Sequence, residues 1–292
     1  MVAAAVQRRA ILLVLAASAA FSVVSALIKA VGPGIPAVEV SLVRGVVMGG
    51  IMLTVLGRRS GGRIPWRTNH PWGHLARSVC GFFGMVSAYY GFSHLPLAAN
   101  TALGFAMPLV LTALSGPLLG ERVGWQRGGA VLTGMVGVLI MVRPWNAEAA
   151  LPLWPALIVL AGVVCWAGSM ISIRRLGKSG ESNEAIILFY SVGSAILAAG
   201  FVVPVWVTPG GWELAGMLAA AVISTGAQLL MTEGYRTGEP SGVAPFEYGA
   251  ILYTSVFGIL IWGEFPDFWS WVGIAVIIAS GLYVWRRETR GD

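Results

Sequence analysis

Three of the charged side chains inside long apolar stretches are the chief candidates for function, because a charge there costs about 2.5–3.5 kcal/mol on membrane-insertion scales. They are Arg44, Glu233 and Glu247. Glu247 lies two residues after Pro245, and its carboxylate is a candidate for binding a substrate ammonium or for carrying a proton. The alternative is an ion pair with a nearby cation such as Arg236. For Glu233 a structural role is favoured.

Arg44 allows two interpretations. Its guanidinium could hold a substrate carboxylate, or it could form an ion pair with Glu39 that sets topology or closes a gate. The two residues are five positions apart, and only side chains three or four positions apart face each other on a helix. A pair within one helix is therefore disfavoured, and both roles of Arg44 stay open.

Uncharged polar and aromatic side chains within the apolar stretches form a second group of candidates. Tyrosine and tryptophan need partners for their O–H and N–H groups when they are buried. A wet cavity provides such partners, and so does a hydrogen bond between helices. The candidates for lining a substrate cavity are Tyr89, Tyr90, Asn100, Trp166, Ser169, Tyr190, Gln228, Tyr248 and Tyr253. Pro108 and Pro245 are candidate hinges, because proline removes a helical hydrogen bond.

The patterns that would indicate an enzyme are incomplete. His70 and His74 have a spacing that could bind a metal, but no third ligand lies near them in the sequence. Gly177-Lys178-Ser179 resembles the end of a phosphate-binding loop, yet Ser172 occupies the position of the required glycine. We therefore expect no metal, no cofactor and no enzymatic activity.

The composition then identifies the elements that must position these residues. The 292 residues are 57% hydrophobic and 11% charged, with a mean hydropathy of +0.77, whereas soluble domains are about 25% charged. A helix of about 20 apolar residues spans the hydrocarbon core of a bilayer. We predict an all-α polytopic membrane protein with ten spans, at residues 10–30, 37–56, 72–94, 96–118, 124–142, 153–173, 183–207, 212–235, 241–262 and 267–285.

The distribution of Lys and Arg predicts the orientation. With the N-terminus inside, 15 of the 19 basic residues fall in inside segments, and only Lys29 and Arg143 fall in outside loops. Basic residues concentrate in cytoplasmic loops. Both termini are therefore predicted to be cytoplasmic, in a bacterial inner membrane. The net charge of +6 follows from this topology, so nucleic acid is not expected as a partner. The lipid bilayer and a small-molecule substrate are the expected partners. The oligomeric state is open, and a monomer is compatible with the sequence.

An internal repeat divides the chain into two halves of five helices, 1–146 and 147–292. Gly120-Glu121 recurs as Gly263-Glu264, and three residues recur 145 positions later: Phe21 as Trp166, Lys29 as Arg174 and Glu39 as Glu184. Because five is odd, the second half enters the membrane in the opposite direction. Inverted repeats are typical of secondary transporters.

The run from Pro108 to Glu121, the glycine-rich helix between Gly129 and Gly137, and Arg44 in the second span resemble the drug/metabolite transporter superfamily, EamA type. The resemblance covers almost the whole chain. It implies transport of small metabolites without ATP hydrolysis, through a central cavity walled by helices 1–4 and 6–9, with helices 5 and 10 to one side.

Two transport functions follow as hypotheses. The first is export of amino acids, aromatic and other neutral ones, by alternating access, as in the family's bacterial amino-acid exporters. The alternative is uptake of a vitamin or nucleoside-like metabolite such as riboflavin or S-adenosylmethionine, because the segment 244–248 resembles members linked to those substrates. Glu247 is the candidate for proton coupling.

Overall fold

The computed structural model describes residues 2–59, 68–107, 110, 114, 125–143, 145, 151–237 and 249–290. These residues form ten α-helices and one short 3-10 helix, and they contain no strand, so the all-α prediction is confirmed. Each predicted span overlaps one helix. The helices are α1 (Val2–Val31), α2 (Ala37–Arg59), α3 (Pro71–His94), α4 (Leu97–Gly104), α6 (Trp125–Val142), α7 (Leu153–Lys178), α8 (Asn183–Val202), α9 (Gly211–Thr237), α11 (Gly249–Trp262) and α12 (Phe268–Arg290), with η1 (Val203–Val205) after α8.

Local sequence signals set the helix ends. Gly32 follows α1 with φ of 84°, a left-handed conformation that glycine adopts without strain. Ser182 caps α8 by accepting a hydrogen bond from the backbone N–H of Ala185 at 3.2 Å. Asp267 caps α12 in the same way, through the N–H of Ser270 at 2.9 Å. At these three positions the local sequence sets where a helix begins or ends.

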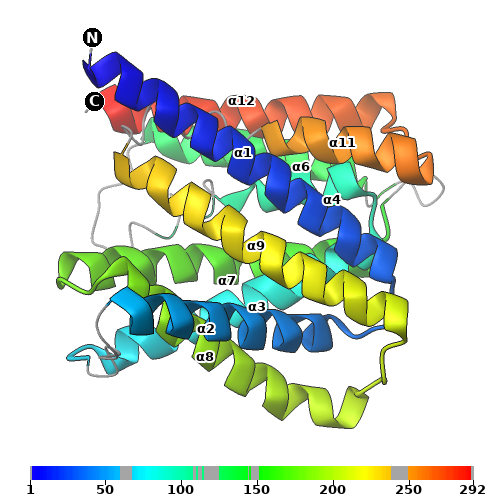
Figure 1. Ribbon diagram of the computed structural model, residues 1–292. Helices are drawn as coiled ribbons and strands as arrows, with labels where there is room; N and C mark the ends of the chain where they lie inside the picture. The colour runs from blue at the N-terminus through cyan, green and yellow to red at the C-terminus, as the bar shows by residue number, and fades with distance from the viewer. Residues whose placement is uncertain are drawn as a thin grey trace.

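The helices lie roughly side by side in one bundle, and both ends of the chain are at the same end of it (Figure 1). We call this the terminal end and the opposite one the far end. α1 starts at the terminal end and finishes at the far end. The main helix pairs are α1 with α9, α3 with α7, α2 with α8, α4 with α11, and α6 with α12.

These pairs are symmetric. In the exchange, each helix of one half takes the place of its counterpart in the other half: α1 and α7, α2 and α8, α3 and α9, α4 and α11, α6 and α12. The α1–α9 pair then becomes α7–α3. The same exchange turns α1–α11 into α7–α4 and α2–α9 into α8–α3, and it leaves the other three pairs unchanged. Each pair thus joins one helix from each half of the chain, and the set of pairs is the same after the two halves are exchanged.

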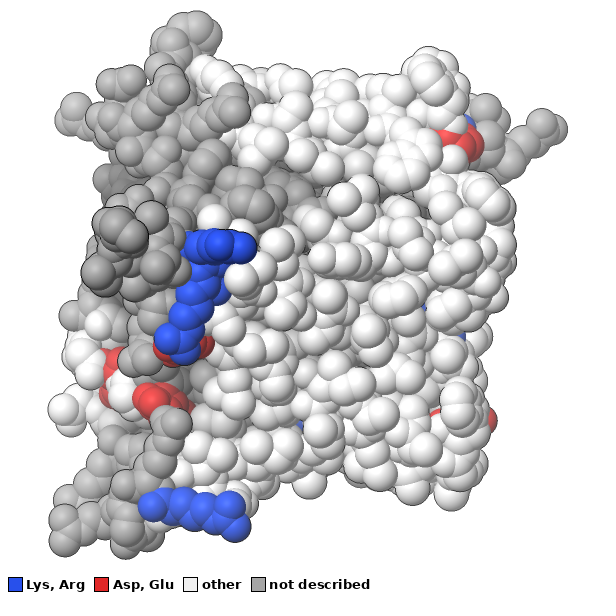
Figure 2. Space-filling view, turned by 45° about the horizontal axis from the view of Figure 1, so that its top comes forward, with Lys and Arg blue, Asp and Glu red and all other residues white. Residues whose placement is uncertain are grey.

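The surface is that of a protein whose solvent is lipid. Large apolar side chains are exposed along the helices, among them Leu12, Val46, Leu132, Ile196 and Leu260. Five of the described helices are long and apolar enough to cross a membrane. On the face in Figure 2, charged side chains lie mostly toward the two ends, and the broad area between them shows very little charge in its described part.

Glycine lets two helices approach closely. A Cβ on Gly273 of α12 would lie 2.8 Å from the backbone oxygen of Gly137 on α6. Such a distance is too short for a side chain at Gly273 unless the helices move apart. The α6–α12 pair is therefore packed backbone against backbone.

Candidate substrate cavity

A cavity of about 280 Å³ lies between α1, α3, α4, α7 and α11. Four aromatic side chains contribute to its wall: Phe21, Phe92, Phe105 and Trp166. We call this space the aromatic cavity. Its size approaches that of pockets for small ligands, which are about 300–1,000 Å³. Neither α6 nor α12 contributes a described residue to the wall.

Small residues make room for the cavity and bring its walls together. Gly84, Ala88, Gly104, Gly162 and Ala250 all line it. A Cβ on Gly84 would lie 3.2 Å from the backbone oxygen of Gly162 and from the backbone nitrogen of Trp166. α3 and α7 therefore cross in direct contact, and this crossing fixes where the Trp166 indole stands.

The wall is uncharged wherever the structure describes it. Its polar side chains are Ser22, Ser25, Asn100, Thr101 and Thr254. With four aromatic rings and no described acid or base, the wall suits the flat face of an uncharged aromatic group better than an isolated carboxylate or ammonium.

An ion pair lies at the far end of the bundle, next to helices that form the aromatic cavity. The Lys29 ammonium lies 2.5 Å from a Glu264 carboxylate oxygen, with the two side chains 11% and 23% exposed. Lys29 also donates to the carbonyl of Leu95 at 2.8 Å, and Glu264 accepts from the N–H of Leu97 at 3.1 Å. The pair thus ties the end of α1 to the α3–α4 and α11–α12 linkers.

The contacts of Glu264 differ from what its position suggests. A carboxylate just before a helix is expected to stabilise the N-terminus of that helix. Glu264 instead binds the first N–H of α4, and Asp267 caps α12. The tertiary packing of α11 against α4 brings Glu264 to the start of α4.

Two buried arginines form a second polar region on the terminal side of the cavity. Arg44 Nε donates to Ser224 at 3.2 Å, and its Nη1 donates to the Tyr190 hydroxyl at 3.3 Å. The Arg77 guanidinium lies 3.8 Å from the centroid of the Tyr190 ring and donates to Ser169 at 2.5 Å. We call Arg44, Arg77 and Tyr190 the arginine cluster.

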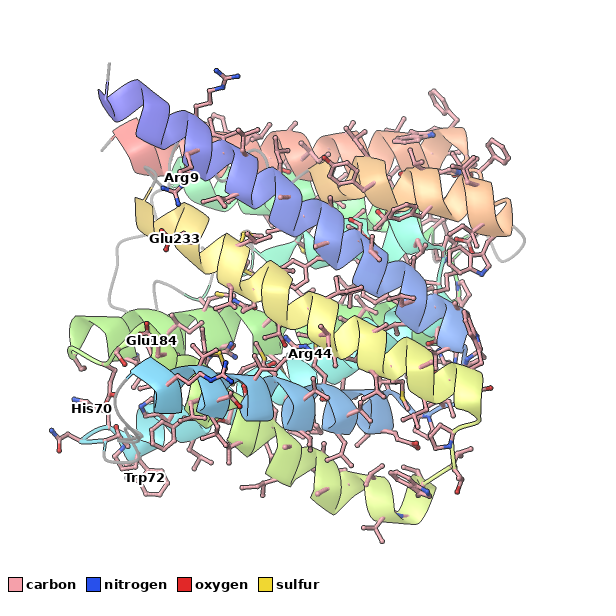
Figure 3. All side chains as sticks on the ribbon, in the orientation of Figure 1. Arg9, Arg44, His70, Trp72, Glu184 and Glu233 are labelled. Atoms are coloured by element: carbon pink, nitrogen blue, oxygen red, sulfur yellow. The ribbon has the colours of Figure 1, made fainter. Side chains whose placement is uncertain are left out.

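The arginine cluster is compact and holds no carboxylate. No described Asp or Glu lies within ion-pair distance of either guanidinium. Glu39, the ion-pair partner considered from the sequence, is fully buried and accepts instead from the N–H of Val207 at 3.2 Å. Figure 3 shows Arg44 midway along the bundle, whereas the other labelled residues lie toward the terminal end.

The candidates from the sequence separate into groups. Asn100 and Trp166 line the aromatic cavity. Arg44, Ser169 and Tyr190 meet in or beside the arginine cluster, and Tyr89 is buried in the apolar core of α1, α2 and α9. Elsewhere, Tyr90 stacks on His94 with ring centroids 4.0 Å apart, Tyr253 is half-buried on α11, and Gln228, which lies on α9, has an interaction partner. Glu247, Tyr248, Pro108 and Pro245 lie outside the described residues.

Sequence reasoning missed several wall residues. Phe21 was matched to Trp166 in the repeat, and both line the aromatic cavity. That match was the signal that could have identified Phe21. Ser22, Ser25, Thr101 and Thr254 carry no comparable signal, because small hydroxyl residues are ordinary in apolar helices.

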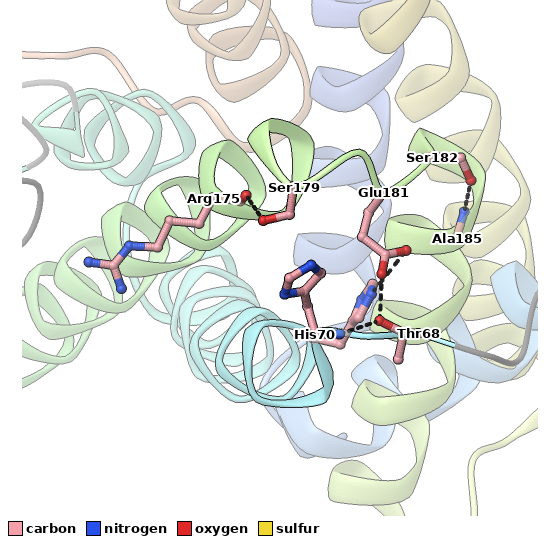
Figure 4. A network of polar contacts seen from close by, with 8 residues as sticks. Thr68, His70, Arg175, Ser179, Glu181, Ser182 and Ala185 are labelled. Atoms are coloured by element: carbon pink, nitrogen blue, oxygen red, sulfur yellow. Dashed lines mark hydrogen bonds and ion pairs between the residues drawn. The ribbon is translucent and has the colours of Figure 1, made fainter.

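The two histidines belong to a network at the terminal end (Figure 4). Glu181 accepts from Thr68 at 2.5 Å and lies 3.6 Å from His74, while the N–H of His70 donates to Thr68 at 2.9 Å. Within the described residues, no three metal-ligating side chains gather. The network joins the start of α3 to the α7–α8 linker.

Paired helices from two halves of the chain around a cavity are typical of secondary membrane transporters. The family model of the EamA-like transporter family matches residues 8–143 and again 153–286. The chain therefore belongs to the EamA-like transporter family and has two repeats of five helices. It is a multi-pass membrane transporter of small molecules.

Curated relatives carry different substrates in their names. A riboflavin transporter from Rhizobium johnstonii is 30% identical over 77% of this chain and 74% of its own length. The pseudopaline exporter CntI of Pseudomonas aeruginosa is 28% identical over 95% and 96%. An S-adenosylmethionine uptake transporter from Rickettsia prowazekii is 24% identical over 78% and 76%. A crystal structure with a TM-score of 0.64 and 19% identity, covering 97% of this chain and 99% of that one, has the same fold.

Proposed function

We propose that this protein moves an uncharged, flat aromatic metabolite of the riboflavin kind through the aromatic cavity by alternating access. The observation that carries the proposal is a wall with four aromatic side chains and no described charge. An isoalloxazine ring is flat and uncharged at neutral pH, so it can stack on such side chains without a desolvated counter-charge. The name of the riboflavin transporter relative supports the same class.

In the proposed orientation both termini are cytoplasmic, the far end faces the periplasm, and the membrane is the bacterial inner membrane. The excess of basic residues in the predicted inside segments supports this orientation. The two repeats, 1–146 and 147–292, would exchange roles as inner and outer gates. Glu247 stays the candidate for proton coupling, and Glu247→Gln is expected to abolish flux driven by a pH gradient.

Export of amino acids, aromatic and other neutral ones, is the second candidate function. It follows from the resemblance to the bacterial amino-acid exporter YddG, and one structural observation favours it. The arginine cluster holds two buried cations without a described acid, and a substrate carboxylate would complement them. The aromatic cavity would then hold the side chain of tryptophan or phenylalanine.

Flux into proteoliposomes separates these candidates. The purified full chain is tested with radiolabelled riboflavin, tryptophan and S-adenosylmethionine. We expect saturable riboflavin flux that falls about tenfold or more in Trp166→Ala, since stacked aromatic contacts and buried area are lost together. Trp154→Ala is the matched control, because Trp154 is on the same helix and 75% exposed. Saturable tryptophan flux without riboflavin flux would support amino-acid export instead.

A further inference from the structure

The hydroxyl groups in the wall of the aromatic cavity share one hydrogen-bonding pattern. Each donates to a backbone carbonyl one turn earlier in its own helix. Ser22 donates to Ser18 at 2.8 Å and Ser25 to Phe21 at 2.9 Å, both on α1. Thr101 donates to Leu97 at 2.9 Å and Thr254 to Ala250 at 2.8 Å. The four hydroxyls come from three helices, α1, α4 and α11.

Such a hydroxyl can still accept but no longer donates. A serine or threonine side chain has one O–H and two acceptor lone pairs. Once the hydrogen is used in the helix, the oxygen offers lone pairs to the cavity. Donating to a ligand would require breaking the bond within the helix.

Asn100 does not add a donor to the wall. Its Nδ2 donates to the carbonyl of Ala88 at 3.1 Å, which fixes the orientation of the amide. Its Oδ1 is buried against Gly91 of α3 and has no hydrogen-bond partner. The indole N–H of Trp166, also in the described wall, differs from the hydroxyl oxygens, because it can only donate a hydrogen bond.

We propose that the aromatic cavity selects ligands by the hydrogen-bond donors that they carry. The ligand class is an uncharged aromatic ring system bearing N–H or O–H groups, and ligands with carboxylates or phosphates at these positions are excluded. This proposal rests on the proposed function and deepens it. The imide N–H and the ribityl hydroxyls of riboflavin are donors of this kind, whereas an ionised carboxylate only accepts.

Ligand analogues test the ligand side of the proposal. Binding to the purified full chain in nanodiscs is followed by the quenching of flavin fluorescence. N3-methylriboflavin has lost the imide donor and kept the ring, so we expect it to bind about three- to tenfold more weakly than riboflavin, the loss typical of one hydrogen bond. Flavin mononucleotide is expected to bind more weakly still, because its phosphate is anionic.

Variants test the protein side. Thr254→Val removes one acceptor from the wall and keeps the shape of the side chain, so riboflavin affinity should fall about threefold or more. Thr133→Val is the matched control. Thr133 donates to Gly129 at 2.9 Å in the same back-bonded geometry, but it is exposed on α6, away from the cavity. Thr254→Ser keeps the acceptor and is expected to retain wild-type affinity.

The outcomes separate this proposal from the proposed function. We call selection by hydrogen-bond donors the donor rule. It is wrong, and the flavin function stands, if riboflavin is carried, N3-methylriboflavin binds as tightly as riboflavin does, and Thr254→Val binds riboflavin as tightly as the wild type does. If riboflavin does not bind, while adenosine binds and N6,N6-dimethyladenosine binds more weakly, the donor rule stands and the flavin function is wrong. If neither riboflavin nor adenosine binds, both are wrong.

Discussion

Two ion pairs at the far end have the same chemistry and different surroundings. Lys29 and Glu264 are 2.5 Å apart, and Arg143 and Asp267 are 2.6 Å apart. The second pair joins the residue after α6 to the residue before α12, two helices that contribute no described residue to the cavity wall. The first pair joins helices that do. The carboxylate of the first pair is 23% exposed and that of the second 45%.

Helical register places the first pair directly over the aromatic cavity. Lys29 is one turn beyond Ser25 on α1, and Leu97 is one turn before Thr101 on α4. Glu264 packs on Gly258, one turn beyond Thr254 on α11. Three wall-forming helices are thus tied together one turn above their cavity residues. Similar ion pairs therefore have different expected roles, closure of the cavity for the first and packing of α6 on α12 for the second.

Among the variants that test this comparison, Lys29→Met is expected to have the largest effect. Breaking the pair leaves the Glu264 carboxylate without its cation and removes a contact that holds α1 to α4 and α11 at the far end, worth about 1–2 kcal/mol after allowance for partial exposure. That corresponds to a shift of about five- to thirtyfold toward open forms. The measurement is the rate at which Ser25→Cys reacts with a membrane-impermeant maleimide, in a background carrying Cys80→Ala and Cys165→Ala.

The second ion pair supplies the control. Arg143→Met removes a comparable pair at the same end, yet labelling of Ser25→Cys should change less than about twofold, because no wall helix is released. Glu264→Gln should behave as Lys29→Met does. Equal labelling in the Lys29 and Arg143 variants would show that the position over the cavity does not matter.

Gly273→Ala is expected to weaken the α6–α12 packing and leave transport intact. The added Cβ would lie 2.8 Å from the Gly137 oxygen and 2.9 Å from the Met141 Cβ, so the helices must separate at a cost of about 1–3 kcal/mol. Thermal unfolding in detergent should shift to a lower temperature, with riboflavin flux per folded molecule unchanged. Gly129→Ala is the control, because a Cβ there meets nothing within 4 Å.

Tyr190→Phe compares the arginine cluster with the aromatic cavity. The change removes the hydroxyl that accepts from Arg44 and keeps the ring under Arg77, so it should cost about 1 kcal/mol of stability. The KM for riboflavin should stay within about twofold, because the cluster does not line the described cavity. A tenfold rise in KM for tryptophan would instead place the cluster in an amino-acid site.

Helix positions were predictable because the spans are long apolar runs, most of them ended by glycine or proline. The cavity was not, because apolar runs do not show which face of a helix meets a neighbour. Asn100 and Trp166 were identified by polarity alone, whereas Phe105 looks like any lipid-facing phenylalanine. The pairing of Lys29 with Glu264 joins residues 235 positions apart in the chain, and only the packing of α1, α4 and α11 brings them together.

The smallest expected effect concerns pH and Asp267, which lies in the linker before α12. Burial tends to raise the pKa of its carboxyl, but hydrogen bonds from Ser270 and the Arg143 guanidinium outweigh burial and hold that pKa below its usual value. A carboxyl whose pKa is lower in the folded state adds stability above its ordinary pKa, and that stability is lost as the pH falls through the folded value. Since Asp267 is 45% exposed, the contribution should stay below about 1 kcal/mol. Thermal unfolding of wild type and Asp267→Asn should therefore differ slightly at neutral pH and converge in acid. No difference at any pH would mean that Asp267 acts through its N-cap hydrogen bond, which asparagine preserves, and not through its charge.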